Sequence, residues 1–589
     1  MKKNYLILIN FLILILICNM LTGKTESSKV KSQSSSSIQP KGKAVEFTIP
    51  EWWYNGVFYQ IFVRSFYDSD GDGKGDLQGI IEKLDYLKDL GITGIWLTPI
   101  FGSFSYHGYD ITNYYVIDDD YGTMEDFEKL VDEAHKRKIK IILDLVINHT
   151  SKKHPWFIDS ATNENSMYKD WYVWSDEQLP GWINASGARQ PAWNSLLDVI
   201  NNSTNYYRYN KFYYTAFNGT IPDLNYENPK VIEEVKNIAK FWLNKGVDGF
   251  RLDGARFIFE DGPGDKQADS PRTIKFWDEF SKYCRTIKPD AYIIAEIFGG
   301  LDKKVLYYTE PNGLSAVFNF EFVSAINSTL AVGKLTQFKL TIKNMIEAIK
   351  RIPKEFFSIF ISNHDVGRFA ELVRTMEKVK IAALLQLTLP GGAPYIYYGD
   401  EIGQREGDKR IGDAWKRNPM WWNSSQLAGF TKNQSTWCGQ MKTDSQFFTN
   451  KINVEDENND PNSVLNFYKK LIKIRKNFVS LQKGDFVEIT IDTNSDKNLE
   501  SVYAFIRNYE NNIAIVVLNS GKNSVVIDQK IDVKIINDNI NKLKYVDGIY
   551  SKDQNNPIPN EIINPIINEG KLKLNLDGRD YILIILEKS

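Results

Sequence analysis

The sequence predicts an α/β fold: a (β/α)8 barrel (TIM barrel) with a small domain inserted after the third strand and a C-terminal antiparallel β-sandwich. Eight short apolar runs, rich in β-branched and aromatic residues, alternate with amphipathic helical segments between residues 57 and 398. One connection is far longer than the others, and it separates the third strand from the fourth. After residue 485 the pattern changes to short alternating strands.

The predicted barrel strands are apolar along most of their length, as strands that are covered on both faces must be. In a (β/α)8 barrel each strand is followed by a helix that packs outside it. Helical patterns accordingly occur at 77–90, 124–138, 230–245, 274–287 and 376–387, and another at 464–477 follows the barrel. The eight strands are expected at 57–66, 92–101, 139–148, 247–254, 292–298, 316–320, 356–362 and 393–398.

The long connection contains about 80 residues before the helix that starts near Lys230, too many for a structureless loop. It is rich in Trp, Tyr, Asn and Pro, and we expect it to form a small domain over 149–222. The barrel then consists of 51–148 and 223–485. The C-terminal sandwich is expected over 486–589, with strands at 502–508, 513–518, 524–527, 571–574 and 581–586.

The bulk composition is that of a globular protein, with 42% hydrophobic and 25% charged residues. A net charge of −2 without a basic stripe argues against nucleic acid as a partner. Aromatic residues reach 13%; most are expected to fill the core, although sugar rings also stack on such faces. Three cysteines form no disulfide framework and no zinc spacing, and whether Cys284 pairs with Cys438 stays open.

The N-terminus has the pattern of an export signal. Two lysines precede an apolar run over 5–17, which is short for a spanning helix, so 1–18 are predicted to be a signal peptide. Cys18 follows the run at once and suggests lipid attachment at that residue. The Ser-rich stretch within 19–50 is interpreted as a flexible tether. A lipid anchor, a released protein and an uncleaved membrane anchor all place the body outside the cytoplasm.

Polar residues at the ends of the predicted strands are the candidates for chemistry, because catalytic groups of such barrels lie at the C-terminal ends of the strands. Arg251 and Asp253 are two residues apart and so project from one face of the fourth strand. Glu296 ends the fifth strand. A carboxylate kept ionised by Arg251 suits a nucleophile, and a Glu crowded by other carboxylates suits a general acid. Such a pair, about 5–5.5 Å apart, would make a retaining glycosidase.

A second acidic pattern follows the first strand. Between residues 68 and 76, aspartates alternate with single small residues, mostly glycine. This spacing places hard oxygen ligands around one centre, as calcium requires. We therefore expect a structural Ca²⁺ there. The predicted ligand loop comprises Asp68, Asp70, Asp72, Lys74 and Asp76.

Five segments together resemble glycoside hydrolase family 13, the α-amylase family: 144–149, 222–225, 249–253, 292–296 and 362–365. The resemblance covers the chain from about residue 52 to its C-terminus. It implies that Asp253 is the nucleophile, Glu296 the acid/base and Asp365 the transition-state stabiliser. It also implies that the calcium loop uses the backbone oxygen of Lys74. The residues that it assigns to substrate binding are His107, Tyr109, His149, Arg251, Arg256, His364 and Arg368.

The sequence departs from this family at Phe257, where a His is common near the family's usual calcium site, so that site, which would involve Asn148, is not expected. Gly254 and Tyr106 favour α-1,4 cleavage by an α-amylase or maltodextrin-cleaving enzyme. The segments 222–229 and 417–421 resemble those of the oligosaccharide-acting branch instead.

Several alternatives stay open. They are an α-glucosidase, oligo-1,6-glucosidase or cyclomaltodextrinase, a transglycosylase or isomerase, and a non-enzymatic glucan-binding or transporter-partner protein. The complete set Asp253, Glu296 and Asp365 argues against the last. The partner is expected to be an α-glucan or malto-oligosaccharide, and the oligomeric state is not indicated.

Overall fold

The computed structural model describes residues 48–185, 190–199, 206–439, 451–494 and 496–588. The predicted signal peptide, Cys18 and nearly all of the predicted tether lie outside these residues. Within the described ranges, no helix has both the length and the hydropathy needed to cross a membrane.

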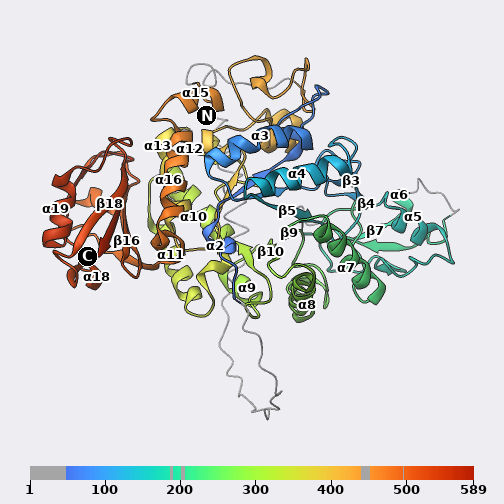
Figure 1. The fold of residues 1–589 in the computed structure, drawn as a ribbon. Helices are drawn as coiled ribbons and strands as arrows, with labels where there is room; N and C mark the ends of the chain where they lie inside the picture. Colours follow the sequence, from blue (N-terminus) through green and yellow to red (C-terminus); the bar gives the residue numbers. More distant parts are fainter. Residues whose placement is uncertain (1–47, 186–189, 200–205, 440–450, 495, 589) are drawn as a thin grey trace, which may run out of the picture. The chain divides into compact units, whose positions relative to one another are not determined.

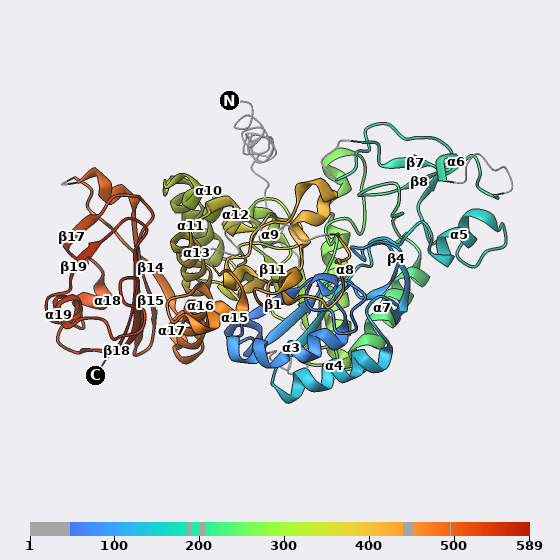
Figure 2. The same cartoon turned by 90° about the horizontal axis from the view of Figure 1, so that it is seen from above.

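Eight parallel strands form the central barrel, and all eight were predicted (Figures 1 and 2). Around the sheet their order is β12-β11-β10-β9-β5-β2-β1-β13, and an isolated parallel bridge between Phe360 and Tyr395 joins its two ends. Every residue of β1, β2, β9 and β10 is buried, which explains why their sequences are apolar except at Gln60 in β1 and Arg251 in β9. The strands are β1 (Phe58–Ile61), β2 (Gly94–Leu97), β5 (Lys140–Leu145), β9 (Gly249–Leu252), β10 (Tyr292–Ala295), β11 (Ala316–Phe318), β12 (Phe357–Ser358) and β13 (Tyr395–Tyr397).

Helices cover the outside of the barrel, and α3, α4, α7 and α8 can be followed in sequence along it (Figures 1 and 2). The helices of the barrel and its C-terminal extension are α2 (Trp52–Asn55), α3 (Leu77–Leu90), α4 (Met124–Lys136), α7 (Pro229–Asn244), α8 (Pro271–Ile287), α9 (Leu301–Leu306), α10 (Phe320–Val332), α11 (Thr336–Ile349), α12 (Phe369–Val373), α13 (Met376–Thr388), α15 (Val454–Asn459), α16 (Val464–Asn477) and α17 (Val479–Lys483).

Capping residues fix where these helices begin and end. The carboxylate of Asp76 accepts the backbone N–H of Gly79 and so satisfies an unpaired donor at the start of α3. Gly91 ends the same helix at φ +98°, a conformation that residues with a side chain rarely adopt. Ser463 caps α16 by accepting the N–H of Asn466. Both helices therefore have the bounds that the sequence predicts.

Two small sheets form within the connections that follow the second and third barrel strands. The first is a hairpin of β3 (Phe101–Ser103) and β4 (Ile111–Ile117), which the sequence analysis does not predict. The second is a three-stranded antiparallel sheet in the long connection, in the order β6-β8-β7. Its elements are α5 (Pro155–Thr162), β6 (Trp174–Ser175), β7 (Trp193–Ser195), α6 (Leu196–Val199) and β8 (Phe212–Tyr214).

The C-terminal part is antiparallel, as predicted, with a five-stranded sheet in the order β14-β15-β16-β20-β18 and a two-stranded sheet of β17 and β19. Aliphatic side chains from both sheets share one core. The sequence analysis misses β14, β18 and the helices α18 and α19. The elements are β14 (Asp485–Ile489), β15 (Val502–Tyr509), β16 (Asn512–Asn519), β17 (Val525–Lys530), α18 (Lys534–Asn537), β18 (Leu543–Tyr550), α19 (Asn560–Glu569), β19 (Lys571–Leu576) and β20 (Tyr581–Lys588).

The cysteine pairing that the sequence leaves open is decided by the structure. Cys284 is buried in α8 and Cys438 is partly buried, and both are free thiols.

Candidate active site

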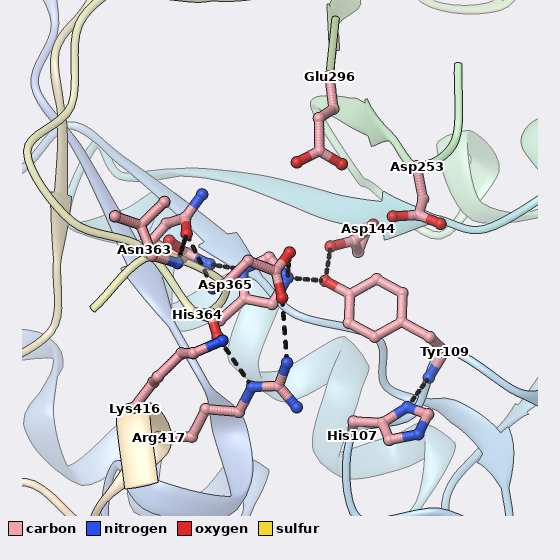
Figure 3. Close-up of polar contacts among 12 residues, drawn as sticks. His107, Tyr109, Asp144, Asp253, Glu296, Asn363, His364, Asp365, Lys416 and Arg417 are labelled. Carbon is pink, nitrogen blue, oxygen red and sulfur yellow. Dashed lines mark hydrogen bonds and ion pairs between the residues drawn. The ribbon is translucent and has the colours of Figure 1, made fainter. Parts of the chain in front are cut away.

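The predicted catalytic residues come together at the C-terminal ends of the barrel strands. Asp144 belongs to the end of β5, Asp253 follows β9, and Glu296 follows β10. Asp365 lies in the loop after β12. Figure 3 shows the carboxylates of Asp253, Glu296 and Asp365 pointing into one common space, with Asp144 drawn between Asp253 and Asp365. The arrangement follows from the parallel barrel, which brings the same end of every strand to one face.

Arg251 is the centre of this cluster. Its Nη1 donates to Asp144 Oδ1 at 2.8 Å and to Asp253 Oδ1 at 2.7 Å, and its Nη2 donates to Glu296 Oε2 at 2.5 Å. The arginine side chain is only 1% exposed, and the side chain of Asp144 is not exposed at all. The side chain of Asp253 is 13% exposed and that of Glu296 is 6% exposed. Of the three carboxyls that bind Arg251, these two are therefore the ones that a substrate can reach.

The electrostatics separate the roles of the carboxyl groups. Burial raises the pKa of Glu296 to about 8; Arg251 opposes this shift, and the charges of Asp253, Asp365 and Asp144 reinforce it. Glu296 therefore keeps its proton at neutral pH. Its Oε1 is buried and has no hydrogen-bond partner among the described residues. The pKa of Asp144 is likewise raised by burial, to about 7, against the opposing charge of Arg251.

Asp365 lies opposite this pair and is held by cationic and hydrogen-bonding groups. Its Oδ2 lies 3.1 Å from His364 Nε2, and its Oδ1 lies 3.1 Å from Arg417 Nη2. Burial opposes ionisation, but His364 and Arg417 together hold the pKa of Asp365 well below its usual range. Its carboxylate is 41% exposed, so an ionised group faces the open side of the site.

A chain of hydrogen bonds runs below the carboxylates, across the bottom of the site. The Gln60 amide contacts His364 Nδ1 at 2.7 Å, His364 Nε2 contacts the Tyr109 hydroxyl at 2.5 Å, and that hydroxyl donates to Asp144 Oδ2 at 2.9 Å (Figure 3). Donation by Gln60 leaves the proton of a neutral His364 on Nε2, and burial lowers the pKa of this histidine. Tyr109 and His364 also stack, with ring centroids 5.4 Å apart.

Comparison with known proteins identifies the family. The profile described as "Alpha amylase, catalytic domain" matches residues 60–484. The chain belongs to the α-amylase family, glycoside hydrolase family 13. It is a glycosidase, as the sequence predicts.

Named relatives agree with this family. The "Alpha-amylase 3" of Dictyoglomus thermophilum is 43% identical over 452 residues, which cover 74% of this chain and 80% of the relative. An "Oligo-1,6-glucosidase" of Parageobacillus thermoglucosidasius is 34% identical over 539 residues, with 81% and 91% coverage. The crystal structure of an α-amylase from H. orenii superposes with a TM-score of 0.72 at 34% identity, covering 91% of this chain and 99% of that one.

Of the remaining residues that the sequence assigns to substrate binding in this α-amylase family member, His149 lies beside the cluster. Its Nδ1 contacts Asn148 Oδ1 at 3.0 Å and its Nε2 contacts the carbonyl of Tyr109 at 3.2 Å. His107 is half-buried; its Nδ1 accepts the backbone N–H of Tyr109 at 3.1 Å and contacts the Ser105 hydroxyl. His107 thus shapes the loop that carries Tyr109 and lies away from the carboxylates (Figure 3).

Two of the arginines that the family resemblance assigns to substrate binding contact residues other than the catalytic carboxylates. Arg256 forms a two-pronged ion pair with Asp269, through Nε at 2.9 Å and Nη2 at 2.5 Å. Arg368 is completely buried, and its guanidinium donates to the side chain of Asn418 at 3.0 Å and to the carbonyl of Tyr398 at 2.7 Å. Arg368 therefore supports the barrel end from inside and has no exposed surface to offer a sugar.

Three residues of the site were missed from the sequence. They are Gln60 in β1, Trp96 in β2, whose indole N–H donates to Asp144 at 3.2 Å, and Arg417, which holds Asp365. A signal for Gln60 was available, because it is a polar residue within an otherwise apolar buried strand. Nothing local marks Arg417, which lies 52 positions after its partner.

The acidic loop that the sequence predicts to bind calcium gathers three carboxylates. One oxygen each from Asp68, Asp70 and Asp76 lies within 4.8 Å of the others, so the group could hold a cation. Asp72 is not part of this group; its carboxylate accepts the backbone N–H of Lys74 at 2.7 Å, and the Lys74 ammonium pairs with Asp120. Among the described residues, no ammonium or guanidinium pairs with the three grouped carboxylates, and this excess of negative charge fits a divalent cation.

Asn148, which would belong to the family's usual calcium site, makes two direct hydrogen bonds in this structure. The Asn148 amide donates to the carbonyl of Phe257 at 2.6 Å and to Asp223 at 3.2 Å. These contacts already join the end of β5 to the segment after β9.

Proposed function

We propose that this protein is a retaining glycosidase that cleaves α-1,4-glucosidic bonds in starch, glycogen or maltodextrins, with Asp253 as nucleophile and Glu296 as general acid/base. The observation that carries the proposal is the sharing of Arg251 by these two carboxyls. Because they bind the two ends of one guanidinium, they are close neighbours, which favours the short separation of retaining enzymes over the wider gap that admits a water.

In the first step, protonated Glu296 donates its proton to the glycosidic oxygen, and the bond from that oxygen to C1 breaks. Asp253, whose carboxylate accepts a hydrogen bond from Arg251 Nη1, forms a bond to C1 and gives a covalent glycosyl-enzyme. In the second step a water loses its proton to the Glu296 carboxylate and attacks C1, and Asp253 leaves. Two inversions at C1 retain the α configuration.

Asp365 supplies the third charge of this mechanism. Positive charge develops on the sugar in the oxocarbenium-like transition state, and an ionised carboxylate on the open side of the site stabilises it. Arg417 and His364 keep Asp365 anionic and fixed in place. Asp144 holds both the guanidinium of Arg251 and the hydroxyl of Tyr109 through hydrogen bonds.

The linkage is the finer part of the proposal. Gly254 has φ +57°, and a Cβ there would approach a carbon of Phe217 to 3.1 Å and Cβ of Asn148 to 3.2 Å. Glycine at 254 therefore has a conformational reason, and this position carries less weight for α-1,4 specificity than its sequence suggests. The similarity to an α-amylase supports α-1,4 cleavage, whereas the oligo-1,6-glucosidase likeness supports an oligosaccharide-acting α-glucosidase as second candidate.

Product analysis decides between these candidates. The purified enzyme is incubated with soluble starch, maltotriose, pullulan and isomaltose, and products are resolved by chromatography while proton NMR records their anomeric form. We expect short maltodextrins from starch, released as α anomers. Rapid isomaltose cleavage with starch left intact would assign the second candidate, β anomers would exclude retention, and transfer products would show transglycosylation.

We further propose that Asp68, Asp70 and Asp76 bind a structural Ca²⁺, which would offset their mutual repulsion and fix the loop before α3. EDTA should then lower the melting temperature of the wild-type protein, and added Ca²⁺ should restore it. Asp70→Asn should lose this response, whereas Asp532→Asn in the C-terminal part should keep it. A wild-type melting curve that EDTA leaves unchanged would contradict the metal.

We infer an extracytoplasmic location, as a surface lipoprotein acylated at Cys18 or as a secreted protein, from the predicted signal segment and tether. Expression of the full chain with labelled fatty acid tests the lipid. Label in the wild type but not in Cys18→Ala would support acylation, and activity in the medium without label would support secretion. Activity confined to the cytosol would contradict both.

A further inference from the structure

A segment outside the catalytic cluster joins the acidic loop to the sugar site. This segment, 430–439, which we call the strap, lies against the acidic loop through three hydrogen bonds. Asp68 N–H donates to the carbonyl of Phe430 at 3.1 Å, Trp437 N–H donates to the carbonyl of Gly73 at 2.8 Å, and the Thr431 hydroxyl donates to Asp68 Oδ2.

The contact at Gly73 is close enough to exclude other residues. Gly73 has φ +94°, and a Cβ at this position would lie 2.8 Å from the carbonyl oxygen of Ser435. The acidic loop therefore needs a glycine here both for its own conformation and for the approach of the strap. The strap is thus fixed on the loop by backbone contacts and not by side chains alone.

The other side of the strap presents Trp437 to the sugar site. Its indole stacks on Tyr106, with ring centroids 5.2 Å apart and planes inclined by 19°. The Tyr106 hydroxyl accepts from Arg417 Nη1 at 3.2 Å, and the same guanidinium holds Asp365 at 3.1 Å. Trp437 is therefore linked to the predicted transition-state stabiliser through two intervening residues, Tyr106 and Arg417.

A second route leads from Trp437 to the same arginine. The indole Nε1–H donates to the Ser65 hydroxyl at 2.9 Å, and that hydroxyl donates to the backbone carbonyl of Arg417 at 2.5 Å. Trp437 thus reaches Arg417 at its main chain through Ser65 and at its guanidinium through Tyr106. Two independent contacts on one residue restrict its movement more than either contact alone.

We propose that Trp437 is a positioning residue of the sugar site: the acidic loop fixes the strap, and Trp437 in turn holds Tyr106 and Arg417 so that Asp365 faces the substrate. The inference rests on the proposed function, because it assigns Asp365 a role in the reaction. Trp437 itself needs no contact with the sugar.

The test compares four forms of the full-length enzyme on maltotriose: wild type, Trp437→Ala, Trp437→Phe and Gln434→Ala. The last is a matched control, because Gln434 is an exposed residue of the same strap whose side chain makes no hydrogen bond to another described residue. All assays are run well below each melting temperature. Loss of the stacked ring should lower kcat/KM about tenfold, mainly through kcat. Trp437→Phe keeps a ring against Tyr106 and should stay within about threefold of the wild type.

The pH profile adds a readout that a merely structural role would not change. Since Arg417 lowers the pKa of Asp365, loosening it should move the acid limb of kcat/KM to higher pH in Trp437→Ala and leave it in place in Gln434→Ala. In a double-mutant cycle, Tyr106→Phe should lower activity in the wild-type background and add little in Trp437→Ala.

A Trp437→Ala enzyme with wild-type kcat/KM and pH profile would overturn the inference and leave the proposed function standing. Full additivity with Tyr106→Phe would overturn it as well. A wild-type protein that releases no sugar from any of the glucans would instead overturn the proposed function together with this inference.

Discussion

The two ends of strand β9 carry aspartates in opposite electrostatic surroundings. At the N-terminal end, Asp248 is fully buried and pairs with His135 at 2.6 Å, Lys140 at 3.0 Å and Lys288 at 2.6 Å. At the C-terminal end, Asp253 shares Arg251 with two other carboxyls. One end has more cationic partners than carboxylates, and the other has more carboxylates than cations.

The difference shows what each end is for. Burial alone would raise the pKa of Asp248, but His135 and the two lysines hold this pKa well below its usual range. The carboxylate therefore stays ionised, and its partners balance its charge. Around Arg251 the carboxylates cannot all be neutralised, and Glu296 keeps a proton at neutral pH. At the Asp248 end the charges are balanced, and the network stabilises the barrel. At the Arg251 end the carboxylates are in excess, so one of them stays protonated and can donate its proton to a substrate.

The largest effect is expected at the catalytic end. Glu296→Gln should lower starch hydrolysis about 1,000-fold, because the amide has no proton to donate to the leaving oxygen. Reducing-sugar release measures this loss, and circular dichroism should show an unchanged fold. Near-normal sugar release by a folded Glu296→Gln protein would show that Glu296 is not the general acid.

At the opposite end, Asp248→Asn should destabilise the protein by about 3 kcal/mol, because Lys140, Lys288 and His135 lose a buried anion. Urea unfolding followed by fluorescence measures the change. The kcat value of the folded fraction should stay within about twofold of the wild type, since Asp248 lies at the far end of the barrel strand from the site. A large loss of kcat without loss of stability would contradict the division between the two ends.

The pH dependence of stability sharpens the same comparison. Folded Glu296 holds its proton up to about pH 8, whereas the unfolded carboxyl releases it near its ordinary pKa of 4.5. Its contribution to stability is therefore complete below about pH 4.5 and is lost as the pH rises towards 8. Glu296→Gln lacks this loss, so its melting temperature relative to the wild type should rise between pH 5 and pH 8. A constant difference across this range would mean that the group titrates normally.

A small effect is expected from Arg256, which the family pattern assigns to the sugar and the structure turns towards Asp269. Arg256→Ala should change kcat less than about threefold, because an arginine held by a carboxylate away from the cluster adds little to the transition state. Steady-state kinetics on maltotriose measures this, with Lys266→Ala on the same loop as control. A tenfold or larger rise in KM would show that Arg256 binds the substrate after all.

The elements that the sequence predicts well are those whose limits are set by local chemistry. The bounds of α3 follow from the Asp76 cap and from Gly91. The positions of the barrel strands follow from their apolar sequences, although the strands are shorter than the predicted segments. The helix α19 was missed because Pro565 and several Asn residues argue against a helix, although its isoleucines bury one face. The hairpin β3–β4 was missed because its first strand has only three residues.

The site divides in the same way. The carboxylates and Arg251 could be predicted because barrel topology brings strand ends together, whichever loops follow. Which loop residue reaches which carboxylate could not be predicted, since no local pattern pairs Arg417 with Asp365 or turns Arg256 towards Asp269. Those pairings depend on the conformations of long loops, which tertiary packing decides.

The most direct test of the central claim traps the glycosyl-enzyme. Glu296→Gln is incubated with an α-maltosyl fluoride, whose fluoride leaves without proton donation while the missing base slows the second step. Peptide mass spectrometry then locates the added sugar. The account predicts a maltosyl ester on Asp253 and none in Asp253→Asn. Fluoride release with an unmodified Asp253, or sugar attached to another carboxyl, would contradict it.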